Sequence, residues 1–205
     1  MTGGHAEDMD DIGRARVKSP AAERILHAAS ELFYEQGIRA VGVDTIADRA
    51  GVTKATLYKN FGSKDELVAA YLRARDERWR AFLQQVTDGH ADSVERLLAV
   101  FDAYSQDLIA EELRGCAFIN ATAEIADPNH PARAVAREHK EGVREHLAAL
   151  AADSGFPDPQ ALAEQLLILL EGATVVAMTR RNPEPFDAAR DVALRLLELK
   201  APAAC

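Results

Sequence analysis

The residues whose types and spacing best suit a chemical role lie between residues 42 and 66, where small, hydroxyl and basic side chains are concentrated. Leu57 and Phe61 are four residues apart, so a helix over 54–61 would point both of them inward. The side chains left facing outward would be Lys54, Ala55, Thr56, Tyr58, Lys59 and Asn60. Ammonium, hydroxyl and amide groups on such a helix can contact phosphates and base edges. The pattern therefore indicates a helix that reads DNA.

A preceding helix and a tight turn must position this reading helix. Ile46, Ala47 and Ala50 recur at helical spacing, and Gly51 follows where a left-handed residue is favoured. Thr53 is a suitable N-cap for the next helix. The sequence therefore predicts a helix-turn-helix unit.

The local charge agrees with this interpretation. Residues 49–64 contain four basic residues and no acidic one, in a protein of net charge -9. Neutralisation of phosphates supplies much of the affinity of DNA-binding proteins. A solvated charged face is the alternative, and the helix, turn and cap pattern favours DNA.

The stretch GVDTIADRAGVTKATLYKNFGSKDEL resembles the tetracycline-repressor-like (TetR) transcriptional regulators, and the match extends over residues 20–72. Their pattern is I-A-x-x-A-G-V-S/T-x-x-T/S-L-Y-x-H/Y-F-x-S/N-K-x-x-L, and nearly every position is filled. The resemblance implies an all-α homodimer with an N-terminal three-helix helix-turn-helix DNA-binding domain. A C-terminal helical domain would bind a small-molecule effector and dimerise.

The resemblance also implies roles for single residues. Thr56, Tyr58 and Lys64 would hold phosphates, assisted by the backbone at Thr53. Base preference would be set by Lys54, Ala55, Lys59 and Asn60. Three positions depart from the family pattern: Gly42 replaces the usual Ser or Thr cap, Asn60 a common His, and Asp44 a basic residue found in some relatives.

We expect three parts along the chain: a disordered arm with a basic end at 1–18, the DNA-binding domain at 19–66, and the ligand-binding and dimerisation domain at 67–205. Arg14, Arg16 and Lys18 in the arm could reach a minor groove, although a basic tail is more often only solvated. Ser19 and Pro20 predict a first helix that ends at Gln36. Ser63 and Glu66 form a capping box for a long fourth helix that joins the domains and reaches about Val86. Further helices are predicted at 93–110, 116–126, 131–152, 159–179 and 186–200.

The helix at 159–179 is apolar almost all round, which requires burial on more than one face. Together with the amphipathic helix at 186–200, it would form a four-helix interface with a second copy of the chain. A core helix of a monomer is the alternative.

A ligand cavity is expected in the C-terminal domain, where aromatic, apolar and polar residues could surround it. For each residue alone, an ordinary core position is the competing interpretation. The candidates are Trp79, Phe82, Phe101, Tyr104, Phe118, Asn120, Glu124, His139, His146, Thr174 and Met178.

A metal-responsive regulator is one alternative, because Glu124, His139 and His146 could converge on a divalent ion. The two histidines would lie about 10 Å apart along one helix, which is long for one ion, so no metal ligand and no cofactor are assigned. Cys116 as a redox sensor has less support, since only Arg114 is a basic neighbour in the sequence.

Other functional classes find little support. The sequence lacks a phosphate-binding loop, a nucleophile elbow and a zinc-protease motif, so we expect no enzyme. Two cysteines and the lack of a signal peptide or a membrane-spanning stretch favour a cytoplasmic protein. A helical protein-interaction module that does not bind DNA remains the other alternative.

The assigned roles give a first prediction. Lys64→Ala should weaken binding to all DNA sequences and reduce the slope of log affinity against log salt by about one unit. Asn60→Ala should mainly change preference at one base position. Salt titrations of binding to several duplexes would measure both effects, and an unchanged slope for Lys64→Ala would contradict its phosphate contact.

Overall fold

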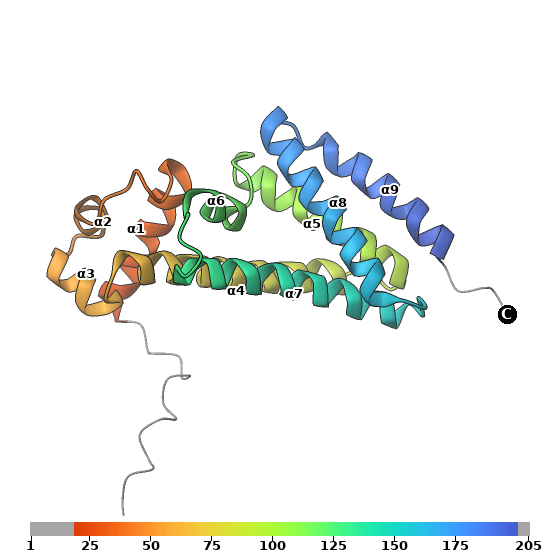
Figure 1. Ribbon diagram of the computed structural model, residues 1–205, viewed down its shortest axis with the longest axis horizontal. Helices are drawn as coiled ribbons and strands as arrows, with labels where there is room; N and C mark the ends of the chain where they lie inside the picture. The colour runs from red at the N-terminus through yellow and green to blue at the C-terminus, as the bar shows by residue number, and fades with distance from the viewer. Residues whose placement is uncertain (1–18, 201–205) are drawn as a thin grey trace, which may run out of the picture.

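The computed structural model describes residues 19–200, which form nine α-helices with no strand among them. The helices form an elongated body with α1, α2 and α3 at one end and α8 and α9 at the other (Figure 1). The two longest helices, α4 and α7, run side by side along its length. The all-α architecture is as predicted, whereas the arm at 1–18 and its minor-groove contact lie outside the described residues.

The N-terminal helices begin and end where their caps predict. α1 spans Pro20–Gln36, and the Ser19 hydroxyl accepts a hydrogen bond from the Ala22 amide. α2 spans Val43–Ala50 and ends at Gly51, whose φ of 63° is left-handed. α3 spans Lys54–Phe61, and the Thr53 hydroxyl accepts from the Thr56 amide at 3.2 Å. Local sequence rules thus define the helix-turn-helix unit.

The later helices also lie close to their predicted ranges. α4 spans Lys64–Asp88, with the Ser63 hydroxyl accepting from the Glu66 amide at 3.0 Å. The remaining helices are α5 Ser93–Ala110, α6 Ala117–Glu124, α7 Pro131–Asp153, α8 Pro159–Arg180 and α9 Glu184–Lys200.

Two hydrophobic cores share α4. The first contains α1–α3 and the start of α4, together with Phe118 and Ala121 of α6 and Val135 of α7. The second contains Trp79 and Leu83 from the other half of α4, packed among α5, α7, α8 and α9. Helices from the C-terminal part therefore complete the core of the N-terminal part. The packing crosses the boundary expected at residue 66.

α8 is long and apolar enough to cross a membrane by length and composition alone. Leu162, Leu166 and Leu170 are fully buried against the second core, while Ile168 is 62% exposed and Val175 43% exposed. A core helix of a soluble protein meets the same criterion, and α8 packs against α7 and α9. This arrangement agrees with the prediction that α8 is apolar on more than one face.

The connection between α5 and α6 has a special backbone. Glu112, Leu113 and Gly115 have positive φ angles of 55°, 58° and 91°. A Cβ atom placed on Gly115 would lie 2.2 Å from the Met178 sulfur. Glycine is favoured at this position, because L side chains rarely adopt its dihedral angle and an added Cβ would require Met178 to shift.

Gly115→Ala should therefore lower the free energy of unfolding by about 1–3 kcal/mol, through backbone strain and overpacking against Met178. Urea unfolding monitored by circular dichroism would measure the change. Gly42→Ser is the control, because Gly42 has a φ of -84° and a Cβ added there would meet no atom within 4 Å. Equal stability of the two variants would show that the Gly115 position tolerates a side chain.

Candidate nucleic-acid interface and ligand cavity

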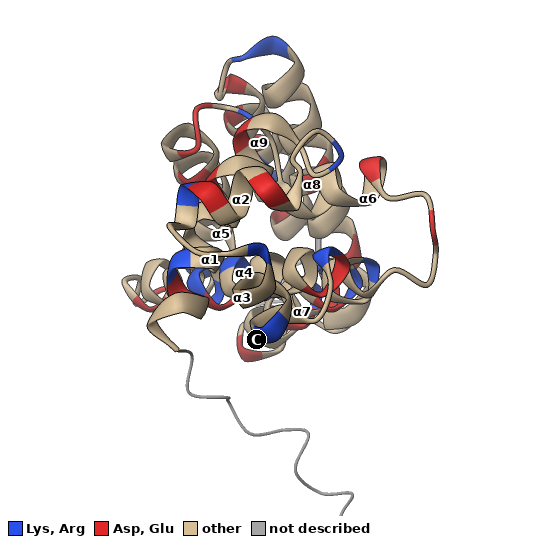
Figure 2. Ribbon diagram, turned by 90° about the vertical axis from the view of Figure 1, so that its left-hand side faces the viewer, with Lys and Arg blue, Asp and Glu red and all other residues tan. Residues whose placement is uncertain are grey.

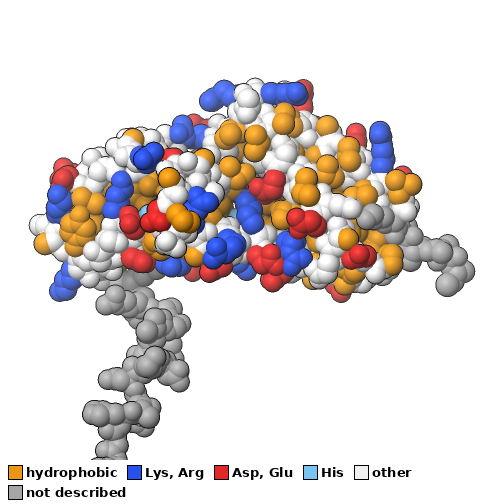
Figure 3. Space-filling view, in the orientation of Figure 1, with side chains coloured by type: hydrophobic (Ala, Val, Ile, Leu, Met, Phe, Trp, Pro, Cys, Tyr) orange, Lys and Arg blue, Asp and Glu red, His pale blue; other side chains and the backbone are white. Residues whose placement is uncertain are grey.

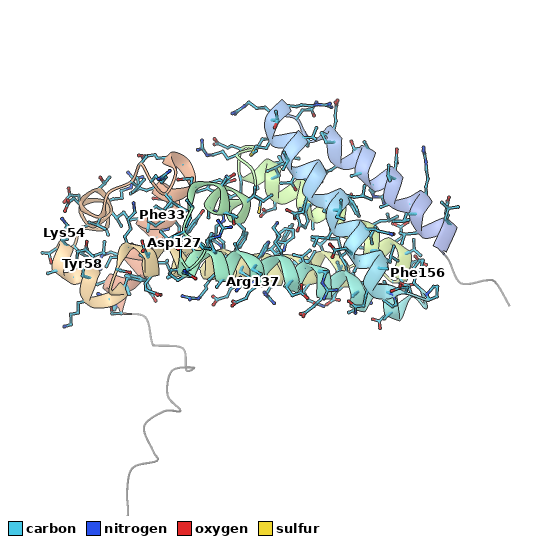
Figure 4. All side chains as sticks on the ribbon, in the orientation of Figure 1. Phe33, Lys54, Tyr58, Asp127, Arg137 and Phe156 are labelled. Atoms are coloured by element: carbon cyan, nitrogen blue, oxygen red, sulfur yellow. The ribbon has the colours of Figure 1, made fainter. Side chains whose placement is uncertain are left out.

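α3 presents its predicted outward face to solvent at one end of the molecule. Leu57 is fully buried and anchors the helix, whereas Tyr58 is 41% exposed. Lys54 and Tyr58 lie at this end of the molecule (Figure 4). Ala55 and Lys59 are also exposed, and Thr56 is half-buried. Most of this face is therefore open to solvent.

Two of the four basic residues in the stretch 49–64 are paired with acidic residues from outside that stretch. The Lys54 ammonium lies 2.8 Å from an Asp44 oxygen across the turn between α2 and α3. Arg49 lies 3.5 Å from Glu31 of α1. Figure 2 views this end and shows acidic residues interspersed with basic ones. Both ion pairs are exposed, and exposed pairs are weak, so phosphates can compete for the two cations.

Asp44 changes the electrostatic environment of Lys54. The hydrogen bond and the negative charge of Asp44 raise the pKa of Lys54 above its ordinary value. Lys54 therefore stays charged, but its ammonium is shared with a carboxylate in the free protein. The acidic residue at position 44, where some relatives have a basic one, thus forms an ion pair with Lys54 that the sequence pattern did not indicate.

Asn60 is held within the protein. Its amide nitrogen donates to the Thr56 carbonyl at 2.7 Å, and its oxygen accepts from the Ser19 hydroxyl at 3.0 Å. The bond from Ser19 joins the end of α3 to the N-cap of α1. A contact between Asn60 and a base edge stays a prediction, and the structure adds a link between helices that the sequence did not indicate.

Lys64 is also engaged. Its ammonium donates to the Ile38 carbonyl at 2.7 Å and lies 5.9 Å from the centre of the Phe33 ring. Burial lowers the pKa of Lys64. The side chain therefore joins the start of α4 to the segment after α1, and its phosphate contact stays a prediction.

The phosphate contacts expected at the start of α3 also remain predictions. The hydroxyls of Thr53 and Thr56 lie 2.9 Å apart, at the helix N-terminus. Because backbone N–H groups at a helix N-terminus favour anions, these hydroxyls are well placed for a phosphate.

A cavity of about 260 Å³ lies between α4, α5, α6, α7 and α8. Six of the residues proposed from the sequence line it: Trp79, Phe82, Tyr104, Phe118, His139 and Thr174. Trp79 and Tyr104 meet edge to face with ring centres 4.8 Å apart, and His139 stacks on Phe118 at 3.6 Å. The cavity therefore has both an aromatic part and a polar, charged part.

Two polar atoms in this wall are unsatisfied. The Trp79 indole nitrogen and the Tyr104 hydroxyl are buried and have no hydrogen-bond partner among residues 19–200. Burial raises the pKa of Tyr104 well above its ordinary value, and the charge of Glu171 acts in the same direction. The Tyr104 hydroxyl therefore stays neutral at physiological pH.

The cavity also contains charged groups that the sequence analysis missed. Arg75 pairs with Glu111 at 2.9 Å, and its guanidinium lies 4.3 Å from the centre of the Tyr34 ring. Asp107 is near this pair, and burial raises its pKa despite the opposing charge of Arg75. Arg75 lies one turn before Trp79 on α4, so helical spacing from Trp79 could have identified it.

The other proposed ligand residues lie elsewhere. Phe101 is buried in the second core, and Met178 packs against Gly115. Asn120 and Glu124 line a separate hollow beside the end of α1, and His146 lines a third between α4 and α7. Spacing along single helices could not separate these neighbouring hollows.

The metal hypothesis was wrong in its geometry. Within the described residues, no three His, Cys, Asp or Glu side chains are close enough to hold an ion. His139 is 2.7 Å from Asp76, His146 is 3.4 Å from the Thr87 hydroxyl, and Glu124 accepts from the Arg39 amide. Each of the three groups thus has a different partner.

Hydrogen bonds connect the cavity wall to the DNA-binding helices. The Tyr34 hydroxyl donates to the Gly115 carbonyl at 2.9 Å. The Arg114 guanidinium donates to the Tyr34 carbonyl at 3.0 Å and to the Glu35 carbonyl. Residues 111–116 therefore bind the last turn of α1 directly.

Comparison with known proteins supports both parts of the chain. Residues 25–71 match the family described as "Bacterial regulatory proteins, tetR family". Residues 93–192 match "Transcriptional regulator LmrA/YxaF-like, C-terminal domain".

A solved TetR-family regulator from Streptomyces coelicolor, SCO4454, is 32% identical, with a TM-score of 0.82 over 90% of this chain and 91% of that one. The transcriptional activator FasR of Mycolicibacterium smegmatis is 36% identical over 51% of this chain and 48% of FasR. The repressor KstR2 of Mycobacterium tuberculosis is 38% identical over 46% of each protein. This chain thus matches about half the length of these two curated relatives.

An exposed α3, held by α1 and α2, defines a helix-turn-helix DNA-binding protein. With the matches over most of its length, the chain belongs to the TetR family of transcriptional regulators. It is a regulator and not an enzyme.

The ion pair at the interface gives a testable prediction. Asp44→Asn should raise affinity for duplex DNA and steepen the salt slope by up to about one unit, because Lys54 would no longer be shared with a carboxylate. Fluorescence anisotropy over a salt series would measure both. Asp48→Asn removes the same charge from the same helix without an ion pair to Lys54. If both variants change the slope equally, the Lys54 pair has no special effect.

Proposed function

We propose that this protein is a ligand-responsive regulator that binds a palindromic operator as a homodimer and is released by a small-molecule effector. The observation that carries the proposal is the direct bonding of the cavity wall, residues 111–116, to the end of α1. A ligand that displaced this wall would move the helix that supports α2 and α3. TetR-family regulators bind DNA and typically form homodimers with small-molecule effectors.

We propose that the protein represses transcription rather than activating it. An operator-bound dimer blocks access to DNA, and release by an effector then relieves the block. KstR2 is a repressor, while FasR is an activator. The choice therefore rests on the effector-release mechanism and not on these two relatives.

The dimer is proposed to form through α8 and α9. Hydrophobic side chains are visible on the upper right part of the surface in Figure 3, where α8 and α9 lie in the same view in Figure 1. The exposed apolar residues of these two helices are Ile168, Val175, Val176, Val192, Leu194 and Leu199. Gly172 lies between them on α8 with open space around it, which would allow a second helix to approach closely. Such an apolar patch favours burial against an identical patch.

Two bound recognition helices would have to reach half-sites about 34–36 Å apart, or a multiple of this distance. A small rotation of α1–α3 relative to α8 and α9 would therefore weaken binding to both half-sites. Within this proposal, residues 19–66 read DNA and residues 67–200 bind the effector and the partner, in the cytoplasm.

Selection of duplexes from a randomised library by the purified protein tests this function. We expect enrichment of a palindrome and a steep salt slope. Tyr58→Ala should abolish enrichment while leaving a dimer in sedimentation experiments. The double variant Ile168→Glu, Val175→Glu should be folded and monomeric and should lose preference for the palindrome.

Ile109→Glu is the matched control for the dimer variant, because Ile109 is 52% exposed but lies on α5. No enrichment at low salt from a folded dimer would reject DNA regulation and favour an interaction module. A double variant that remained dimeric would reject the α8 and α9 interface.

A further inference from the structure

Two arginines of α4, Arg75 and Arg78, line the cavity. The Arg75 side chain is 12% exposed, and its one ion-pair partner within residues 19–200 is Glu111, at 2.9 Å. Because a guanidinium carries several N–H donors, Glu111 leaves some of them without an acceptor, and no Arg75 nitrogen among the described atoms is both occluded and unbonded. Arg78 is exposed and forms no ion pair with another described residue. The cavity therefore presents guanidinium groups that a ligand can reach.

The start of α6 lies at the same cavity and adds to its positive potential. Residues 115–118 are part of the cavity lining. Cys116 is the N-cap but makes no side-chain capping bond, and the amides of residues 117–119 have no acceptor in the described part of the chain. Free amides at a helix N-terminus carry a partial positive charge that favours anions. This helix end therefore supports the effect of the two arginines.

Acidic side chains near the arginines reduce this positive potential but do not match it. Glu111 is paired with Arg75, and Asp107 lies at the exposed edge of the cavity. Partial burial raises the pKa of Asp107, and the charge of Glu111 acts in the same direction. The two carboxylates offer fewer acceptor sites than the two guanidinium groups and the helix end offer donors. An anion would therefore find unused donors, whereas a cation would compete with arginines that are already in place.

The rest of the cavity suits a small, flat and apolar ligand body. Trp79, Phe82 and Phe118 are among the side chains that line it, and its volume is about 260 Å³. Ligand pockets usually measure roughly 300–1,000 Å³, so this cavity favours a ligand of one or two rings. Aromatic side chains pack well against the faces and edges of a planar ring.

We propose that the effector is a small aromatic carboxylate, whose carboxylate accepts hydrogen bonds from Arg75 and Arg78 while its ring packs against the aromatic side chains. The proposal rests on the proposed function, because it names the ligand class of the same cavity. A guanidinium can bind a carboxylate through two parallel hydrogen bonds, which gives direction as well as strength. Arg75 is the main recognition residue, since it is nearly buried, and Arg78 contributes at the exposed edge.

Arg75 also connects the ligand to α1. Its guanidinium lies 4.3 Å from the centre of the Tyr34 ring, and the Tyr34 hydroxyl donates to the Gly115 carbonyl. A ligand carboxylate that competes with Glu111 for Arg75 would shift the guanidinium relative to Tyr34. The contact between α1 and residues 111–116 would then loosen, and DNA affinity should fall.

The test uses the full chain and three probes that share a naphthalene ring: naphthoate is anionic, naphthylmethanol is neutral and naphthylmethylammonium is cationic. Isothermal titration calorimetry would measure their affinities. Trp79 is the one tryptophan of the sequence, so fluorine NMR of protein labelled with fluorotryptophan would show whether a probe binds in the cavity. Naphthoate should shift the Trp79 resonance and bind at least about tenfold more tightly than the other two, because only a carboxylate accepts charge-assisted hydrogen bonds from Arg75.

Arg75→Met should lower the affinity for naphthoate by about tenfold and leave the affinity for naphthylmethanol unchanged, since only the charged contact is lost. Arg73→Met is the matched control, because Arg73 is an exposed arginine of α4 outside the cavity lining. Asp107→Asn should raise the affinity for naphthoate, since it removes a negative charge beside the arginines. Unchanged binding of the neutral probe would also show that each variant is folded.

Three outcomes would overturn the anion site: tighter binding of the cationic probe, equal binding of all three probes, or a Trp79 resonance that does not move. An equal loss of naphthoate affinity in Arg75→Met and Arg73→Met would overturn Arg75 as the recognition residue.

The second readout is binding to the duplex enriched from the randomised library. Saturating naphthoate should weaken DNA binding by about tenfold, a change of about 1.4 kcal/mol, and should have less effect on Arg75→Met. Tight binding of naphthoate without a loss of DNA affinity would overturn the effector role. If the free protein bound no duplex, the proposed function would fail, and the probe comparison would still decide whether the cavity selects anions.

Discussion

The attachment of residues 111–116 to the last turn of α1 is the constraint on which the rest of the molecule depends. Tyr34 and Arg114 form its bonds, and each uses a backbone carbonyl of the opposite segment. Gly115 has a left-handed backbone, and its carbonyl accepts the hydrogen bond from Tyr34. Because α1 packs against α2 and α3, these bonds connect the helix-turn-helix unit to a loop that is also a cavity wall.

The packing reinforces this dependence. Phe118 lies in the core shared with α1–α3 and also lines the cavity, so one side chain belongs to both. Close-packed cores transmit displacement because they contain little free volume. Under the proposed function, a ligand in the cavity would therefore contact the core that supports α1–α3 directly.

Nearly the whole secondary structure could be predicted from the sequence, because its signals are local. Ser19, Gly51, Thr53 and Ser63 act within three or four residues of themselves, and the helices they delimit lie within two residues of the predicted ranges. The aromatic half of the cavity was predictable for a similar reason, since Trp79 and Tyr104 are large and recur at helical spacing.

The charged partners were not predictable, since each requires a contact between distant segments. Lys54 with Asp44, Lys64 with the Ile38 carbonyl, and Lys140 with Cys116 are separated by 10, 26 and 24 residues. In each case the sequence suggests only a solvated cation, whereas the folded protein gives the lysine a specific hydrogen-bond acceptor. The same physical fact holds at both ends of the molecule, because Lys54 is paired with Asp44 and Lys140 with Glu171, so an anion that bound either lysine would have to compete with a carboxylate.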